Sequence, residues 1–410
     1  MNKKLMTLAV AGAFAAPAAA FAQASNVQIF GTVYLEYAYA KQGNAGGGPA
    51  VGNSPAGNLN AGDLVNVDIL QSPGSEIGIK GEEALGGGTS VWFQCTSTAD
   101  IRGSSTAGFC SRNSAIGVKG AFGNAYGGNW DMPMKRSAGA ARIVSDTGIW
   151  GVGRMLYGDS STFLANGTPT AFSRRQNNSL FYDTPNFSGF QGYLGVSTTG
   201  TSIGQTGAVS GSKPRMWSVA GTYNNGPLYV TLAYEKHSNF SVGGGPVTTG
   251  YGGDDKAWHA GIAYQFGPVK VGLLYVDRKY DMSSTTDMDV KAWNLAAEWN
   301  IVGPHSLRGG YTKADDTGGN AGAGTNNAFV VGASGGTLTA NGGAGGTGAN
   351  IWQIQYVYNA SKRTEFTAGY IRLSNDGNAR YSLGGLSSSG TFVRTGEDQQ
   401  AFAVSIKNTF

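Results

Sequence analysis

Charged residues are scarce in this chain of 410 residues. Lys, Arg, Asp and Glu make up 13% of it, whereas typical soluble domains contain about 25%. A chain with so little charge would lack an ordinary water-exposed surface, but it does not need one if its outer face meets lipid. The net charge of the whole chain is only +4, which gives no reason to expect nucleic acid or another polyanion as a partner.

Long apolar runs are missing as well. Beyond the N-terminus no stretch reaches the ~18 apolar residues of a transmembrane helix. This absence excludes membrane-spanning helices. It does not exclude membrane-spanning strands, because their signal in each segment is weak.

Residues 1–24 have the pattern of a secretory signal peptide. Lys3 and Lys4 precede an apolar core, and the small residues that follow resemble a cleavage site, which we place after Ala24. A membrane helix would need about 20 apolar residues, and this run is shorter. We therefore expect an exported chain, residues 25–410, with 29 − 2 = 27 cations against 25 acids, a net charge of +2.

Residue types that carry catalysis or bind metals are few. His237, His259 and His305 are separated by 22 and 46 residues, and no carboxylate or Cys partners stand at ligand spacing, so no metal site is expected. Glycine clusters such as Gly151-Val152-Gly153 lack the lysine and the strand-turn-helix context of a phosphate-binding loop. We expect neither an enzyme nor a cofactor, and we interpret the His side chains as solvated or directed into a lumen.

Only two cysteines are present, Cys95 and Cys110, on either side of a polar connection centred near residue 102. In an exported chain a disulfide can form and persist, and here it would tie the base of a hairpin loop. The alternative is two unpaired thiols, which would react with a thiol label.

Glycine and aromatic residues are abundant, with 67 Gly, 19 Tyr, 18 Phe and 8 Trp, and apolar side chains alternate with polar or small ones as in strands. In the segment Gln399 to Phe410 the apolar residues fall on one face. They are Phe402, Val404, Ile406 and Phe410, opposite Ala403, Ser405 and Lys407. Val27 to Ala40 alternates in the same way. A terminal strand would fray if unpaired, so we expect these two segments to pair and close a barrel.

Short turns and long polar connections alternate between the predicted strands. Seven short turns and eight long connections join sixteen strands. The long connections are Gln42–Gly62, Ile101–Phe109, Asp131–Phe172, Thr199–Pro214, Ser238–Asp255, Met282–Thr286, Asp315–Gly348 and Asn375–Glu397. This organisation is typical of bacterial transmembrane barrels. The sequence predicts an all-β, sixteen-stranded antiparallel barrel; the alternative, a soluble sandwich or propeller, would carry far more charge on its outward face.

Four stretches resemble the trimeric general-diffusion porins of Gram-negative outer membranes. They are the opening strand Val27–Glu36, the strand and turn Ser75–Gly88, the segment Arg175–Phe190, which is the most specific, and the C-terminal strand ending at Phe410. The resemblance implies an outer-membrane homotrimer in lipid, with a water-filled channel for passive diffusion of small hydrophilic solutes and ions. It also implies that Phe410 belongs to the signal for barrel assembly.

The same resemblance implies a pore constriction. The third outer loop of such porins folds into the barrel, and residues 131–172 occupy its place here. We expect Asp146 or Asp159 to face a basic wall that includes Arg112, Arg175, Lys80 and Arg308. Glu76 replaces an expected Arg, and Gly128 stands where another Arg often occurs, so we predict weak selectivity that leans to anions. The alternative is that these charges lie at the rim, where salt screens them.

Three other functions are alternatives to a general channel. An outer-membrane enzyme would need a catalytic constellation that the sequence does not supply. A receptor barrel with a plugged lumen would need a plug domain, and none precedes Val27. A substrate-specific channel for a sugar or organic anion should show inward aromatic residues, whereas the predicted inward positions are mostly Gly, Ala, Ser, Thr, Gln and Asn.

Overall fold

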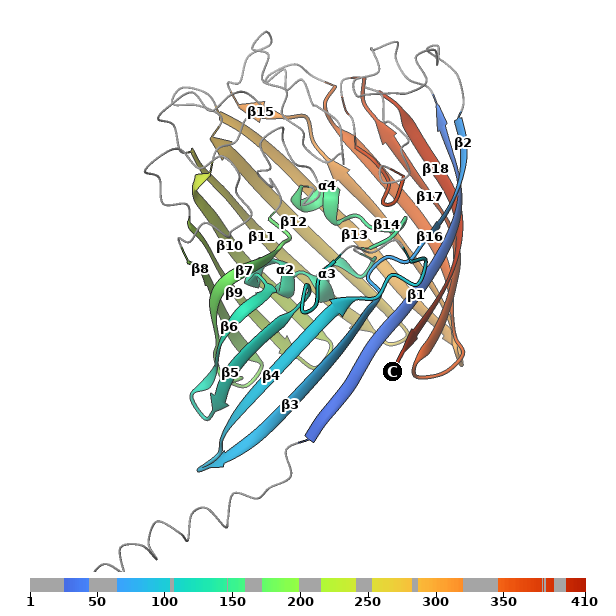
Figure 1. Cartoon of the computed structure of the whole chain (residues 1–410). Coiled ribbons are helices and arrows are strands. Elements are labelled where there is room, and N and C mark those ends of the chain that lie inside the picture. The colour runs from blue at the N-terminus through green and yellow to red at the C-terminus, as the bar shows by residue number, and fades with distance from the viewer. Residues whose placement is uncertain are drawn as a thin grey trace, which may run out of the picture.

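The computed structural model describes residues 26–43, 65–103, 107–145, 147–158, 172–198, 215–240, 253–281, 287–319, 346–377, 379, 381–386 and 396–410. The predicted signal peptide, Asp146 and Asp159 lie outside these residues. The described chain forms one antiparallel sheet that closes on itself, with short helices inside it (Figure 1). No described helix is long and apolar enough to cross a membrane.

The wall is a continuous series of hydrogen-bonded strands. The first half contains β1 (Asn26–Gly43), β2 (Val65–Gln71), β3 (Glu76–Gly86), β4 (Thr89–Thr98), β5 (Ser114–Gly120), β6 (Gly123–Asp131), β7 (Arg175–Asp183), β8 (Phe190–Ser197) and β9 (Arg215–Asn225). The second half contains β10 (Leu228–Phe240), β11 (Gly253–Phe266), β12 (Val269–Asp281), β13 (Asp287–Val302), β14 (His305–Ala314), β15 (Gly318–Gly319), β16 (Ala349–Asn359), β17 (Thr364–Asn375) and β18 (Asp398–Thr409).

These eighteen segments make sixteen wall strands. β2 and β3 pair with successive halves of β1 and form one interrupted strand, and β15 continues β14 along β13. β1 pairs with β18 from Thr32↔Thr409 to Gly43↔Asp398, which closes the barrel. The predicted fold and the predicted closing pair are confirmed. The segment Val65–Gln71 was not predicted as a strand, because Pro73 and Gly74 interrupt the alternation that follows it.

Apolar side chains cover the outer face of the barrel. Large residues such as Leu232, Ile262 and Leu295 are exposed at alternate positions, where a membrane protein meets lipid tails. Near the long-loop end, Trp and Tyr on neighbouring strands pair with ring centroids 5.1–5.4 Å apart. The pairs are Trp217–Tyr234, Trp258–Tyr275, Trp293–Tyr311 and Trp352–Tyr370. Rings at this level form the aromatic belt expected at a membrane interface.

The connection between β6 and β7 lies inside the barrel. Its helices α2 (Pro133–Ser137), α3 (Gly139–Arg142) and α4 (Gly153–Tyr157) appear within the ring of strands in Figure 1. α2 contacts β9 and β10, α3 contacts β10 to β13, and α4 contacts β12 to β14. Buried apolar side chains of this connection, including Met134, Trp150, Leu156 and Phe172, form the hydrophobic core against the inner wall.

Small residues on the inner wall allow α3 to come close. Gly272, Ala296 and Gly310 lie directly opposite one another on β12, β13 and β14. A methyl group on Gly272 would lie 2.3 Å from the carbonyl oxygen of Ala141, and one on Gly310 would lie 3.0 Å from Val144. Part of the high glycine content is therefore explained by the packing of this loop against the wall.

Candidate functional site

The loop is fixed to the wall strand β1 through Glu36. The carboxylate of this residue is fully buried and accepts hydrogen bonds from the backbone N–H of Ile149 at 2.7 Å, from Gln71 Nε2 at 2.5 Å and from the Tyr34 hydroxyl at 2.6 Å. A buried carboxylate needs such partners, because an unsatisfied one is costly. The loop therefore reaches from β9 and β10, where α2 packs, across the barrel to β1.

His259 holds the loop from the other side. Its Nδ1 lies 2.8 Å from the Tyr157 hydroxyl, and its Nε2 lies 3.2 Å from Ser137 Oγ and 3.1 Å from Thr231 Oγ1. The imidazole thus connects α2 and α4 to β10 and β11. His259 and His237 are both 0% exposed, so they are buried beneath the loop and not solvated. Among the described residues no group of His, Cys, Asp and Glu forms a metal site.

A cavity of about 320 Å³ lies between the loop and the wall. The loop contributes Ile143, Ser145, Thr147 and Trp150. The wall and its connections contribute Thr32, Tyr34, Pro73, Gly74, Arg112, Arg308, Gln355, Glu365, Thr367 and Lys407. This cavity brings together Arg112 and Arg308, two of the basic residues predicted from the sequence.

Each basic side chain of this cavity has a carboxylate partner. Arg112 pairs with Glu76 at 2.6 Å, Arg308 with Glu298 at 3.3 Å and Lys407 with Glu365 at 3.3 Å. All six side chains remain partly exposed, between 18% and 41%. This cavity therefore presents paired charges to solution, not an uncompensated basic wall.

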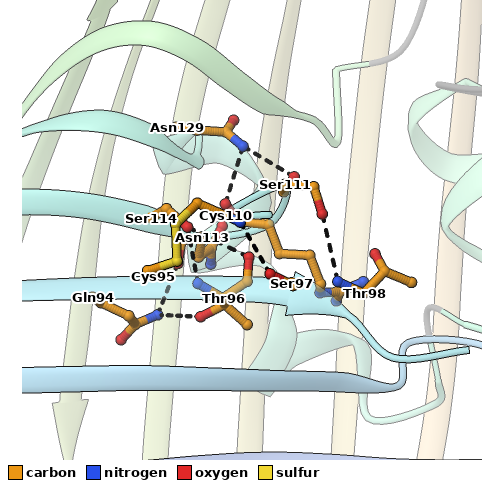
Figure 2. Close-up of a disulfide and its surroundings, with 11 residues drawn as sticks. Gln94, Cys95, Thr96, Ser97, Thr98, Cys110, Ser111, Asn113, Ser114 and Asn129 are labelled. Atoms are coloured by element: carbon orange, nitrogen blue, oxygen red, sulfur yellow. Dashed lines mark hydrogen bonds between the residues drawn. A yellow bond between two sulfur atoms is a disulfide. The ribbon is translucent and has the colours of Figure 1, made fainter. Parts of the chain in front are cut away.

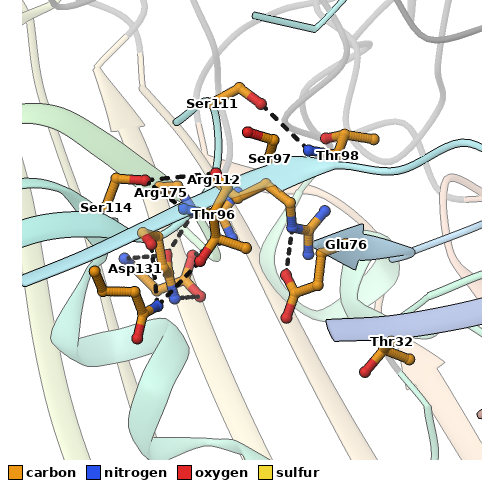
Figure 3. Close-up of polar contacts among 12 residues, drawn as sticks. Thr32, Glu76, Thr96, Ser97, Thr98, Ser111, Arg112, Ser114, Asp131 and Arg175 are labelled. Atoms are coloured by element: carbon orange, nitrogen blue, oxygen red, sulfur yellow. Dashed lines mark hydrogen bonds and ion pairs between the residues drawn. The ribbon is translucent and has the colours of Figure 1, made fainter. Parts of the chain in front are cut away.

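Arg175 lies in a neighbouring group around Asp131. Its Nη2 is 3.3 Å from Asp131 Oδ1, and Lys135 Nζ is 3.0 Å from the same oxygen. Figure 3 shows Arg175 and Asp131 next to Arg112, with Glu76 on the far side of Arg112. This group and the three pairs above together contain five cations and four carboxylates, which is a local excess of one positive charge. The cations are Arg112, Arg308, Lys407, Arg175 and Lys135, and the carboxylates are Glu76, Glu298, Glu365 and Asp131.

The segment that carries Arg112 is fixed to β4. The structure joins Cys95 and Cys110 in a disulfide whose Cα atoms are 4.8 Å apart. Around it, the backbone N–H of Arg112 donates to the carbonyl of Thr96 at 2.8 Å. The backbone N–H of Cys110 donates to Ser97 Oγ at 3.0 Å (Figure 2). Arg112 thus lies just before β5 and two residues after the disulfide-bonded Cys110, so its backbone is held in place.

Lys80 does not join the Arg112 group. It lies on β3, four residues nearer the short-turn end than Glu76, which corresponds to about 13 Å of strand. Its Nζ lies over the ring of Phe30, 5.1 Å from the centroid. Lys407 and Glu365, by contrast, were not singled out in the sequence as pore residues, although alternation already placed Lys407 on the polar face of the last strand.

Several inward aromatic residues were also missed. Trp92, Tyr126, Trp130 and Phe181 form a cluster with neighbouring centroids 5.1–5.7 Å apart. Beside it, Arg136 of α2 bonds Asp183 through both terminal nitrogens, at 2.9 and 2.7 Å. Burial alone would lower the pKa of the Arg136 guanidinium, but these bonds raise it above its usual value.

A closed barrel with an apolar exterior and a polar lumen is a membrane channel protein by architecture. The chain matches the family model described as Gram-negative porin over residues 7–378. It therefore belongs to the Gram-negative porins, which are outer-membrane channels for the passive diffusion of small hydrophilic solutes.

Curated relatives agree with this assignment. The chain is 27% identical to outer membrane porin protein 32 of Delftia acidovorans over 418 residues, which covers 100% of both chains. It is 26% identical to the major outer membrane protein P.IB of Neisseria meningitidis serogroup B over 256 residues, 59% of this chain and 68% of that one.

Solved structures share the fold. The anion-selective porin from Comamonas acidovorans superposes with a TM-score of 0.67 at 23% identity, over 94% of this chain and 100% of that chain. A trimer form of OmpT from Vibrio cholerae gives a TM-score of 0.61 at 13% identity, over 95% of this chain and 100% of that one.

Proposed function

We propose that this porin is a general-diffusion channel with a weak preference for anions, narrowed by residues 131–172, and that it has no catalytic activity. The observation that carries the proposal is the set of charges around Arg112, Arg175 and Arg308. Five cations face four carboxylates, all on or beside the channel wall. Because nearly every charge is paired, the excess is small and the expected selectivity is weak.

The similarity to an anion-selective porin supports the sign of this preference. The cavity between loop and wall supports the position of the constriction, because Arg112 and Arg308 line it together with loop residues. Asp146 and Asp159 remain candidates for the acidic side of the constriction.

A substrate-specific channel is the second candidate, and one observation favours it. The inward cluster of Trp92, Tyr126, Trp130 and Phe181 offers aromatic surface inside the barrel. Its central rings, Tyr126 and Phe181, are buried in a small apolar core with Met132 and Met216. This packing leaves little aromatic surface to a passing solute and favours the general channel.

The assembly is proposed to be a homotrimer. On β3 to β6 the outward positions carry aliphatic or small residues, Phe93 and, close to the short turn, Glu83, with no Trp or Tyr among those described. Strands β9 to β17, by contrast, carry the Trp–Tyr pairs. A sector without interfacial aromatics is suited to contact a neighbouring subunit, and the trimer form of the Vibrio cholerae protein supports this arrangement.

The test is conductance of the purified protein in a planar lipid bilayer. A general channel gives stepwise, ohmic openings whose size rises in proportion to salt concentration. Liposome swelling with uncharged sugars of increasing size then separates the candidates. A general channel gives rates that fall smoothly with size, whereas a specific channel gives saturation or inhibition by one solute.

A further inference from the structure

A second cavity lies on the short-turn side of α3. Its volume is about 500 Å³, and it is bounded by Ala140 of α3 and by residues at the short-turn ends of β9 to β12. The cavity around Arg112 shares none of these residues. The two cavities therefore lie on different parts of the loop.

Lys270 is the charged residue of this second cavity. It lies two residues below Gly272, where α3 touches the wall, and directly opposite Gln265 on β11 and Glu298 on β13. Glu298 is in turn opposite Arg308 on β14. A row of charges, Lys270–Glu298–Arg308, thus runs along the wall immediately beneath the small residues that receive the loop.

In this row of three charges, Lys270 is the one available to bind an anion. Glu298 forms its ion pair with Arg308, and within the described ranges Lys270 makes no ion pair. No carboxylate lines the second cavity, whose polar side chains are Lys270, Gln265, Asn224 and Tyr229. A cation in such surroundings attracts an anion, and one cation matches one carboxylate.

The remaining lining residues supply apolar surface next to these polar groups. Ala140, Pro227 and Ala263 contribute apolar atoms beside Tyr229, and the Tyr229 hydroxyl donates to the carbonyl of Ser137 at 2.6 Å. Pockets of this volume that combine apolar surface with a few polar groups and one charge are typical of small-molecule sites. The lining therefore fits a solute with an apolar body and a single negative group.

We propose that this cavity is a binding station for small monocarboxylates with an apolar body, held through Lys270. The proposal rests on the channel function above and adds a solute class to it. Arg308 and Lys270 are two strands apart, which is about 10 Å. An anion released at Arg308 would meet the next cation within roughly one Debye length at physiological salt, and such successive weak sites permit conduction.

The experiment measures block of chloride current by benzoate added from the short-turn side in a planar bilayer. Benzamide lacks the charge, and acetate lacks the apolar body. The variants are Lys270→Gln, which removes the charge, and Lys270→Arg, which keeps it. Lys119→Gln is the matched control, because Lys119 lies at the same end of the barrel but is paired with Glu82.

We expect benzoate to block at lower concentration than acetate and benzamide not to block. Lys270→Gln should raise the half-blocking concentration of benzoate about tenfold, since one charge-assisted hydrogen bond is lost. Lys270→Arg and Lys119→Gln should leave it unchanged. Equal block in Lys270→Gln and wild type, or equal block by benzamide, would overturn the proposal.

Titration calorimetry of benzoate with the detergent-solubilised protein separates the two proposals. Calorimetry measures the affinity of benzoate for the cavity and needs no ion current. A protein that does not conduct would therefore contradict the channel function, but the effect of Lys270→Gln on benzoate affinity could still be measured. Absence of a Lys270-dependent affinity there would sink the station alone.

Discussion

Arg112 donates a hydrogen bond from Nε to Glu76 Oε2 at 2.6 Å, and the two side chains form an ion pair inside the barrel (Figure 3). The two residues are 36 positions apart in the chain. In the sequence, Glu76 replaces an Arg that the family resemblance leads one to expect. In the structure it compensates the neighbouring Arg112, which is why the charges around Arg112, Arg175 and Arg308 keep an excess of only one cation.

The first prediction concerns this pair. Glu76→Gln should shift the reversal potential in a salt gradient toward anions, because five cations would then face three carboxylates instead of four. Arg112→Gln should bring it close to zero, with four of each, and the double variant should resemble wild type. Glu76→Arg should give the largest anion shift, most visible in dilute salt, where screening is weakest.

Substitutions in the Glu82–Lys119 pair serve as the control, because that pair is about half exposed at the short-turn end. If the Glu76 variants shift the potential no more than these controls do, the charges lie at the rim and the proposed constriction is misplaced.

The second prediction concerns the contact between α3 and the wall. Gly272→Ala places a methyl group 2.3 Å from the carbonyl oxygen of Ala141, so α3 must move away from β12 into the lumen. Overpacking of this kind costs about 1–3 kcal/mol. We expect lower single-channel conductance with an intact barrel.

Gly221→Ala is the matched control, since a methyl group there would have no atom within 4 Å. Conductance equal in the two variants would mean that the position of α3 does not limit the current.

The third prediction concerns the end of the chain. The backbone N–H of Phe410 donates to the Gly31 carbonyl at 3.0 Å, and that of Gly31 donates to the Phe410 carbonyl at 3.1 Å. Deletion of Phe410 removes both bonds, each of which contributes about 0.5–1.5 kcal/mol, and it removes the aromatic residue that we propose as part of the assembly signal.

The deletion should therefore strongly reduce the amount of folded, heat-modifiable protein in the outer membrane. Phe410→Tyr, which keeps both bonds and the ring, should assemble normally. Wild-type levels of the deletion variant would argue against a role of Phe410 in assembly.

Alternation in the sequence was sufficient to predict the barrel, because lipid outside and water inside impose opposite demands on successive residues. The pairing of β1 with β18, which closes the barrel, followed from the same alternation in Val27–Ala40 and Gln399–Phe410. The strand Val65–Gln71 was missed because the break at Pro73 and Gly74 separates it from the rest of its wall strand.

The site could be predicted only in part. Arg112 and Arg308 were singled out and line one cavity, but their carboxylate partners depend on strand register, which a single sequence does not give. Glu298 lies opposite Arg308, and Glu365 lies opposite Lys407, only because of the pairing of β13 with β14 and of β17 with β18. His259 faces the inside of the barrel, which was one of the two expectations, but its burial was not predicted because the loop that covers it comes from more than 100 residues earlier in the chain.

The measurement that tests the account most directly is the reversal potential of the wild-type channel across a salt gradient, repeated at decreasing mean salt. One excess cation among the charges around Arg112, Arg175 and Arg308 predicts a small potential of the anion-selective sign. This potential grows as the Debye length rises from about 8 Å at physiological salt to about 30 Å at 0.01 M. A potential of the cation-selective sign in dilute salt, or no conductance at all, would contradict it.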